Sequence, residues 1–148
     1  MPTLFLICGL PGSGKTTLAK NIEREQRALR LCPDEWITQM IGDGDDEVKR
    51  AAVEAVQWKV AARALTLGVN VVLENGFWSR QERDDFKSRA RRLGADAKLY
   101  FLDVDREELL RRLGLRNADL PPNTFRVGEA LLDSCICSFE PPTPDELE

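Results

Sequence analysis

A glycine-rich segment near the start of the chain carries the clearest chemical signal. Residues 9–16 read Gly-Leu-Pro-Gly-Ser-Gly-Lys-Thr and match the pattern GxxxxGK[ST] in full. In this pattern, glycines let backbone N–H groups approach phosphate oxygens, the lysine neutralises the β- and γ-phosphates, and the final hydroxyl binds Mg²⁺. The segment therefore predicts a nucleoside triphosphate site. It does not indicate whether the phosphate passes to water or to a substrate.

Individual residues of this P-loop segment have expected contacts. We expect Lys15 to contact the β- and γ-phosphates, Thr16 to be a ligand of Mg²⁺, and Thr17 to contact the α-phosphate. The start of the following helix adds the positive end of its dipole. The expected nucleotide-binding residues are Gly9, Pro11, Gly12, Ser13, Gly14, Lys15, Thr16 and Thr17.

Strands and helices alternate along the chain around this segment. The apolar run of residues 3–8 is typical of a buried strand, and the apolar positions after Lys15 repeat at helical spacing. Further strands are expected at residues 28–32, 69–73 and 97–104, and helices at 15–24, 48–67, 79–93, 107–113 and 124–132. The alternation predicts βαβ units and a parallel sheet with helices on both faces.

Smaller features complete this outline. Asp34 stands where the N-cap of a helix is expected, and residues 42–46 have the composition of a loop. The proline-rich tail after Phe139 is expected to be extended, and a fifth strand near Cys135 is considered. We expect a single domain over residues 1–148, of which 113–148 form a lid and C-terminal segment.

Composition and charge exclude several classes of function. The 148 residues include 21 Lys and Arg, 25 Asp and Glu and no His, for a net charge of −4. This balance argues against broad, charge-driven wrapping of nucleic acid. The absence of histidine excludes Ser-His and Cys-His catalysis and mixed Cys/His zinc sites. With four cysteines expected to be reduced, no secretory leader and no long apolar run, the sequence favours a soluble cytoplasmic protein.

Several sequence blocks in order carry a family resemblance. These blocks are LICGLPGSGKTTLA, CPDEW, VVLENGFWSRQERDDF, YFLDVDREELLRRLGLRN and FEPPTPDE. Together they resemble the small kinases of the P-loop class with an AAA-like ATP-binding domain. These are similar to chloramphenicol phosphotransferase, the zeta-toxin kinases and the kinase domain of phage polynucleotide kinase. The resemblance covers nearly the whole chain and implies an α/β fold, the P-loop NTPase three-layer sandwich with a short parallel sheet.

The resemblance also implies an arrangement of the strands. The strand that ends before Asp34 and the strand that carries Glu74 are expected on one side of the P-loop strand. The strand at residues 97–104 is expected on the other side. The carboxyl ends of these strands would then meet at one edge, where open α/β sheets bind ligands.

The resemblance further implies roles for charged residues outside the P-loop. Asp34 matches the aspartate that activates the acceptor hydroxyl, although it is also interpretable as a helix cap. Glu74 matches the acid that holds Mg²⁺, where the family more often has aspartate; the alternative is a strand-end carboxylate facing solvent. Arg112 and Arg116 match the lid arginines that bind the triphosphate, the alternative being a solvated basic face. Arg83 belongs either to an arginine-rich stretch common in the family or to a solvated helix face.

One position departs from the polynucleotide kinases. They have an arginine three residues after the base aspartate, which grips a phosphate beside the acceptor hydroxyl. Here that position is Ile37, next to Trp36. The apolar pair suggests an acceptor with an apolar part and without an adjacent phosphate.

These observations lead to one favoured function and two alternatives. We expect ATP- and Mg²⁺-dependent transfer of the γ-phosphate to a hydroxyl of a small molecule, with Lys15, Asp34, Arg112 and Arg116 as catalytic residues. One alternative is a 5′-hydroxyl polynucleotide kinase, with nucleic acid as partner. The other is a non-kinase nucleotide-binding switch or ATPase. The sequence leaves the acceptor and the oligomeric state open.

Overall fold

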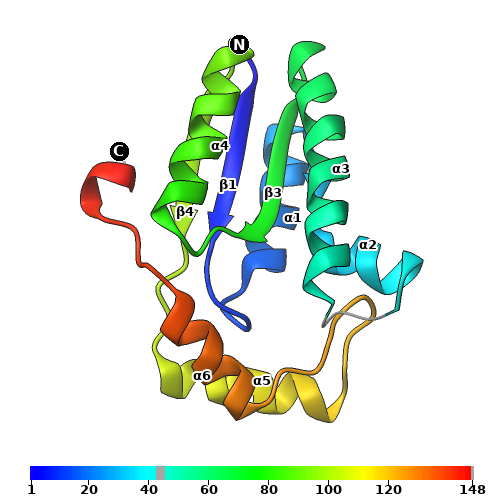
Figure 1. Ribbon diagram of the computed structural model, residues 1–148, viewed down its shortest axis with the longest axis vertical. Helices are drawn as coiled ribbons and strands as arrows, with labels where there is room; N and C mark the ends of the chain where they lie inside the picture. The colour runs from blue at the N-terminus through cyan, green and yellow to red at the C-terminus, as the bar shows by residue number, and fades with distance from the viewer. Residues whose placement is uncertain (43–45, 148) are drawn as a thin grey trace.

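A parallel sheet forms the centre of the molecule. The computed structural model describes residues 1–42 and 46–147. Its strands are β1 (Thr3–Cys8), β2 (Ala28–Leu31), β3 (Asn70–Gly76) and β4 (Asp96–Phe101). They pair in parallel in the order β2-β3-β1-β4 (Figure 1). This confirms the predicted fold class and strand order, with β2 and β3 on one side of β1 and β4 on the other.

Helices cover both faces of the sheet and its carboxyl edge. They are α1 (Lys15–Gln26), α2 (Pro33–Met40), α3 (Glu47–Thr66), α4 (Arg80–Arg92), α5 (Arg106–Ala118) and α6 (Glu129–Ser138), followed by the 3₁₀ helix η1 (Pro144–Leu147). In Figure 1, α5 and α6 lie across the end of the molecule toward which the strands point. Among the described residues, no helix combines the length and apolar character needed to span a membrane.

Alternating side chains of β1 build the two sides of the core. Leu4 and Leu6 pack in one cluster with residues of α3 and α4, whereas Phe5 and Ile7 pack in a second cluster with α1. All four side chains are buried because successive residues of a strand point to opposite faces, and both faces of this sheet are covered. The result is the predicted three-layer sandwich.

The structure corrects two predicted elements. Cys135 lies in α6, so the fifth strand considered near this residue is wrong. The helix expected at 124–132 begins instead at Glu129, after Gly128 in extended conformation. Apolar residues of α5 and α6 pack in a separate small cluster, which explains why a 3.6-residue pattern appears in this region. The loop expected at 42–46 lies largely outside the described residues.

The four cysteines are free thiols. Burial raises the pKa of Cys8 and of Cys32 to about 11, so both stay protonated near neutral pH. Cys8 fills the end of β1, and its Sγ donates to the carbonyl of Phe77 over 3.3 Å. These thiols behave as small apolar groups of the core.

The C-terminal segment is fastened to the body by a buried ion pair. Glu146 of η1 accepts from Nε of Arg83 over 2.7 Å, and both side chains are 1% exposed. Arg83 also donates to the carbonyl of Phe77 over 2.9 Å, and Lys87 donates to the backbone carbonyl of Glu146 over 2.8 Å. Arg83 is therefore a buried anchor, and its interpretation as a solvated helix face is wrong.

The Glu146→Gln substitution tests this anchor. Removing one partner leaves the Arg83 guanidinium buried without its counter-charge, so we expect a loss of about 3 kcal/mol in the free energy of unfolding. Burial opposes ionisation of Glu146, but bonds from Arg83 and the backbone of Thr143 hold its pKa at about 2. The stabilisation should therefore be present above about pH 4.5 and fall as the pH drops toward 2.

Chemical denaturation of both proteins over this pH range measures the effect. Glu140→Gln is the matched control, because Glu140 is an exposed acid of the same segment, and it should change stability by less than about 0.5 kcal/mol. A loss in Glu146→Gln no larger than that of the control would contradict the anchor.

Candidate active site

The P-loop joins β1 to α1 through glycines that no other residue replaces easily. Gly12 and Gly14 have φ angles of 83° and 96°, in the left-handed region. A Cβ on Gly12 would also lie 3.0 Å from Cγ of Leu113. Helix α1 begins at Lys15 without a side-chain cap, so its first N–H groups are available to an anion. The predicted phosphate cradle is thus present as a backbone feature.

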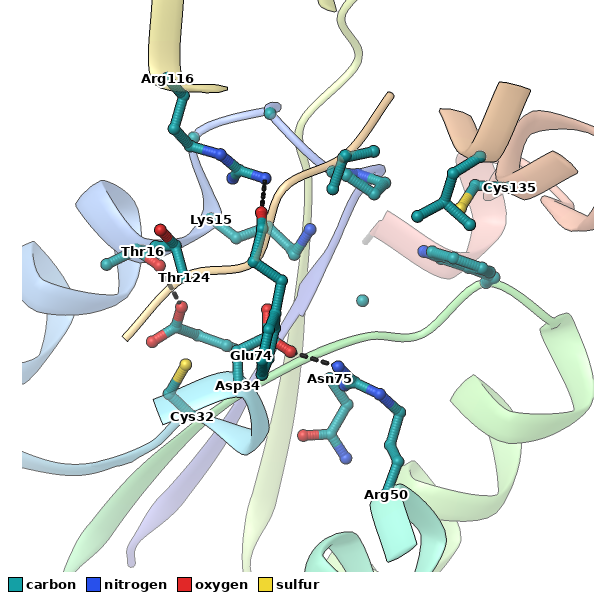
Figure 2. A pocket seen from close by; sticks show the side chains of 18 of the residues that line it. Lys15, Thr16, Cys32, Asp34, Arg50, Glu74, Asn75, Arg116, Thr124 and Cys135 are labelled. Carbon is teal, nitrogen blue, oxygen red and sulfur yellow. Dashed lines mark hydrogen bonds and ion pairs between the residues drawn. The ribbon is translucent and has the colours of Figure 1, made fainter. Parts of the chain in front are cut away.

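The side chain of Lys15 folds back over this cradle. Its Nζ donates to the carbonyls of Gly9 over 3.2 Å and Leu10 over 3.0 Å. Desolvation lowers the pKa of Lys15, while the nearby carboxylates of Asp34 and Glu74 oppose this shift. Figure 2 shows the ammonium at the inner wall of the pocket. A bound polyphosphate would give this cation a stronger partner than two carbonyls.

Thr16 and Glu74 meet across the end of the sheet. Oγ1 of Thr16 donates to Oε1 of Glu74 over 2.7 Å (Figure 2). The other carboxylate oxygen of Glu74 pairs with Arg30 of β2. The Glu74 side chain is only 2% exposed, so the alternative in which it faces solvent is wrong.

This pair fits Mg²⁺ by its donor chemistry. Mg²⁺ is usually held by one or two protein oxygens together with substrate phosphates and water. Thr16 and Glu74 supply a hydroxyl and a carboxylate beside the phosphate cradle. In the described part of the chain, no group of three or more His, Cys, Asp or Glu is gathered for a metal ion. The residues present therefore suit a metal that arrives with a nucleotide.

Asp34 lies in the first turn of α2 and reaches the cavity. The N-cap of α2 is Cys32 and the first helical residue is Pro33, which corrects the prediction that Asp34 is the cap. Its carboxylate pairs with Arg50 of α3 and is about half exposed (Figure 2). The neighbouring Glu35 instead pairs with Arg30 over 2.6 Å. Of the two acids, only Asp34 lines the cavity.

The two lid arginines are on α5, one turn apart. Nη1 of Arg112 lies 3.5 Å from the carbonyl oxygen of Gly12, and Nη2 of Arg116 donates to the carbonyl of Phe125 over 3.2 Å. Desolvation lowers the pKa of Arg116, whereas Asp34 raises it. Arg111 turns outward to Glu108. Nε of Arg112 donates to the same carboxylate over 3.0 Å, so the side chain of Arg112, which is 41% exposed, belongs both to the helix surface and to the cavity wall.

One cavity of about 750 Å³ connects these groups. Lys15, Thr16, Arg112 and Arg116 line it at the P-loop. Asp34 faces it from α2, and further residues come from β3, α3, α4 and the segment between α5 and α6. The structure thus brings Asp34 into one chamber with most of the predicted nucleotide-binding residues, namely Pro11, Gly12, Gly14, Lys15, Thr16, Thr17, Arg112 and Arg116. Gly9 and Ser13 are not among the residues that line it.

Several residues of this chamber were not found by sequence reasoning. Arg50 and Glu54 of α3 and Glu82 of α4 all line the cavity. The only sequence signal is the spacing of Arg50 and Glu54, which are four residues apart on one helix face. Conversely, Ile37 is 1% exposed and Trp36 packs against the core, so this apolar pair does not face the acceptor as expected.

A tight turn after β3 brings Trp78 into the cavity wall. Gly76 has a φ of 89°, and a Cβ there would lie 2.9 Å from Nε1 of Trp78. Phe77 follows with a φ of 49° and is completely buried. The Trp78 indole donates to the carbonyl of Gly9 over 3.0 Å. The turn therefore joins the wall of the cavity directly to the P-loop.

Two carboxylates beside Trp78 are unusually basic. Burial raises the pKa of Glu54 to about 7, with a further contribution from Glu82; Arg50 acts in the opposite direction and Asp34 adds to the rise. Burial also raises the pKa of Glu82. Each acid is held partly out of water in a pocket, which is an environment typical of functional sites.

Comparison with known proteins identifies the family. A family model described as an AAA domain matches residues 4–142. The chain belongs to this family. Its membership agrees with the resemblance drawn from the sequence blocks. No curated protein sequence matches this AAA-domain chain at a significant level.

Solved structures share the fold of this AAA-domain chain. A chain of the Pnkp1/Rnl/Hen1 RNA repair complex matches with a TM-score of 0.77 and 21% identity over 93% of this chain and 43% of its own. A sugar kinase from Janibacter sp. HTCC2649 matches with a TM-score of 0.71 and 19% identity, over 99% of this chain and 83% of the kinase. Chaetomium thermophilum Kti12 in complex with ADP-AlF3 matches with a TM-score of 0.71 and 17% identity, over 96% of this chain and 82% of Kti12. The chain thus spans less than half of the first of these.

The Glu54→Gln substitution tests the electrostatic state of the cavity. The folded protein raises the pKa of Glu54 from 4.5 to about 7, so it binds more protons than the unfolded chain between these values. Stability should therefore fall as the pH rises from about 4.5 through 7. Glutamine carries no titratable proton, so the Glu54→Gln protein should not lose stability in this way. We expect its free energy of unfolding at pH 8 to exceed that of the wild type by about 1–2 kcal/mol, after allowance for solvent screening.

Urea denaturation at a series of pH values measures this difference. Glu25→Gln, an exposed acid on α1, is the control and should follow the wild type at every pH. A Glu54→Gln protein that is less stable than the wild type at pH 8 would contradict the raised pKa.

Proposed function

We propose that the chain is an ATP- and Mg²⁺-dependent phosphotransferase that moves the γ-phosphate to a hydroxyl of a small molecule. The observation that supports this most is the single cavity lined by the P-loop, by Arg112 and Arg116, and by Asp34. A protein that only hydrolyses a nucleotide has no need of a chamber that extends from the phosphate cradle to the Asp34 carboxylate of α2. Such a chamber suits a second substrate.

The proposed transfer exchanges one P–O bond for another. The acceptor oxygen forms a bond to the γ-phosphorus while the bond from that phosphorus to the β–γ bridging oxygen breaks, and the electron pair leaves with ADP. The hydroxyl proton passes to the carboxylate of Asp34, which is the general base. Arg50, which pairs with this carboxylate, orients it.

The cationic groups have the complementary task. Lys15 and the first N–H groups of α1 bind the β- and γ-phosphates, and Arg112 and Arg116 approach from α5 to neutralise the transferred group. Thr16 and Glu74 would hold Mg²⁺, which would offset the negative charge of the phosphates. Arg30, paired with Glu74, fixes the orientation of this carboxylate.

Two observations weigh against a nucleic-acid acceptor. The position of the phosphate-gripping arginine in polynucleotide kinases is the buried Ile37. The cavity wall beyond Asp34 also carries Glu47, Glu54 and Glu82, which repel a phosphodiester backbone. The neighbour from an RNA repair complex keeps this alternative worth an assay, and phosphorylation of a 5′-hydroxyl oligonucleotide would revive it.

The Asp34→Asn substitution tests the base. Asparagine keeps the shape but takes no proton, so we expect kcat to fall about a hundredfold or more while the affinity for Mg-ATP changes less than about twofold. Transfer of γ-labelled phosphate to a panel of hydroxyl compounds, with a water-only control, measures turnover. Titration with a fluorescent ATP analogue measures affinity.

Lys15→Ala is the matched comparison in the same cavity. It should lose both nucleotide affinity and transfer, because it removes the cation of the phosphate cradle. Label released only as free phosphate, at equal rates in wild type and Asp34→Asn, would refute the phosphotransferase and favour the switch or ATPase.

A further inference from the structure

The two ends of the cavity carry opposite charge. At the P-loop end the lining includes Lys15, Arg112 and Arg116, as a polyphosphate requires. Away from the P-loop, the lining has four acids, Asp34, Glu47, Glu54 and Glu82, against two cations, Arg50 and Arg126, and Arg50 is paired with Asp34. A pocket whose acceptor end is this acidic disfavours carboxylated or phosphorylated acceptors and favours a cation.

Glu54 and Glu82 face the cavity from different helices without a counter-ion. Arg50 is engaged with Asp34, and within residues 1–42 and 46–147 no side chain donates a hydrogen bond to either glutamate or forms an ion pair with it. The charge of Glu82 is close enough to raise the pKa of Glu54. Both carboxylates are half-buried in the cavity wall, and the charges of Arg50 near Glu54 and of Arg83 and Arg89 near Glu82 only partly oppose the rise in their pKa values.

Asn75 and Trp78 also belong to the wall of the cavity. Oδ1 of Asn75 is buried and, among the described residues, accepts no hydrogen bond. Asn75 directly follows Glu74 at the end of β3, beside the phosphate site. The ring of Trp78, whose indole N–H is engaged by Gly9, also lines the cavity and offers an aromatic surface that attracts cations. Of these two residues, Trp78 offers a surface that attracts a cation, whereas Oδ1 of Asn75 is buried from the cavity beside Glu74.

We propose that the acceptor is a hydroxylated amine, whose ammonium group binds between Glu54 and Glu82 beside Trp78 while its hydroxyl meets Asp34. This assignment rests on the proposed phosphotransferase and specifies its substrate class. Asp34 lies near enough to Glu54 to influence its pKa, so an ammonium and a hydroxyl of one small molecule can reach both. An amino sugar or an aminocyclitol has this pattern of groups.

Binding of matched probes tests the cation site. The probes are glucosamine and kanamycin, each with its N-acetylated form, which keeps the hydroxyls but loses the charge, and gluconate as an anion. Calorimetry with Mg²⁺ and a non-hydrolysable ATP analogue gives each affinity. We expect each amine to bind at least about tenfold more tightly than its N-acetylated form, as charge-assisted hydrogen bonds to a carboxylate imply.

Variants identify the residues responsible. Glu54→Gln and Glu82→Gln should each weaken amine binding about tenfold and leave the affinity for the N-acetylated forms within about twofold. Glu25→Gln, on the exposed face of α1, should bind as the wild type does. Amine affinity should also increase between about pH 6 and pH 8, as Glu54 loses its proton. Because Glu54→Gln is expected to be the more stable protein at pH 8, unfolding would not explain its loss of binding.

The outcomes separate this inference from the proposed function. Amines that bind in this pattern but receive no phosphate would keep the cation site and refute the phosphotransferase. Transfer to gluconate or to the N-acetylated compounds in preference to the amines would keep the phosphotransferase and overturn the cation site. Absence of saturable amine binding, or glutamine variants that still discriminate as the wild type does, would overturn it as well.

Discussion

Parallel pairing of β1 with β3 is the constraint on which the whole site depends. The register sets Cys8 opposite Gly76, and the ladder continues past the strands as the N–H of Gly9 donates to the carbonyl of Gly76 over 3.0 Å. The P-loop and the turn after β3 therefore start side by side. The carbonyl of Gly9 then accepts from both Lys15 and Trp78. One backbone group thus links the phosphate-binding lysine to the wall of the acceptor chamber, and a shift of either strand would separate them.

The fold was predictable because its signals are local and mutually consistent. The apolar run of β1, the glycines after it and the helical pattern from Lys15 describe one βα unit, and the parallel sheet follows from its repetition. The position of Asp34 at the same edge of the sheet as the P-loop also follows, since the carboxyl ends of parallel strands share one edge. The assignment of Asp34 as a cap was wrong, because Pro33 is favoured at the first helical position and the helix therefore starts two residues earlier than predicted, with Cys32 as its cap.

The acceptor end was not predictable because it is assembled from distant helices. From the sequence, Arg50 and Glu54 are indistinguishable from ordinary charges of an exposed helix, and only the packing of α3 beside α2 brings them to the cavity. Glu82 is likewise indistinguishable from an ordinary acid in the first turn of a helix. Arg83 shows the same limit: an arginine in a run of charges gives no hint of burial, which arises only when Glu146, 63 residues later, returns to it. Such pairs depend on tertiary packing, which periodicity does not encode.

The resting site is held together by contacts that a ligand must replace. Asp34 is paired with Arg50, Thr16 with Glu74, and Lys15 and Arg116 with backbone carbonyls. Lys15 and Arg116 are thus oriented before a nucleotide arrives. Nucleotide binding would replace their backbone carbonyl partners by phosphate oxygens, and these side chains would lose little conformational entropy in the exchange. Glu54 and Glu82 are the exception, because among the described residues no side chain forms an ion pair or donates a hydrogen bond to either carboxylate, although both line the cavity. Carboxylates kept in this arrangement lower the stability of the empty protein, and such a loss is typical of groups positioned for a ligand rather than for the fold.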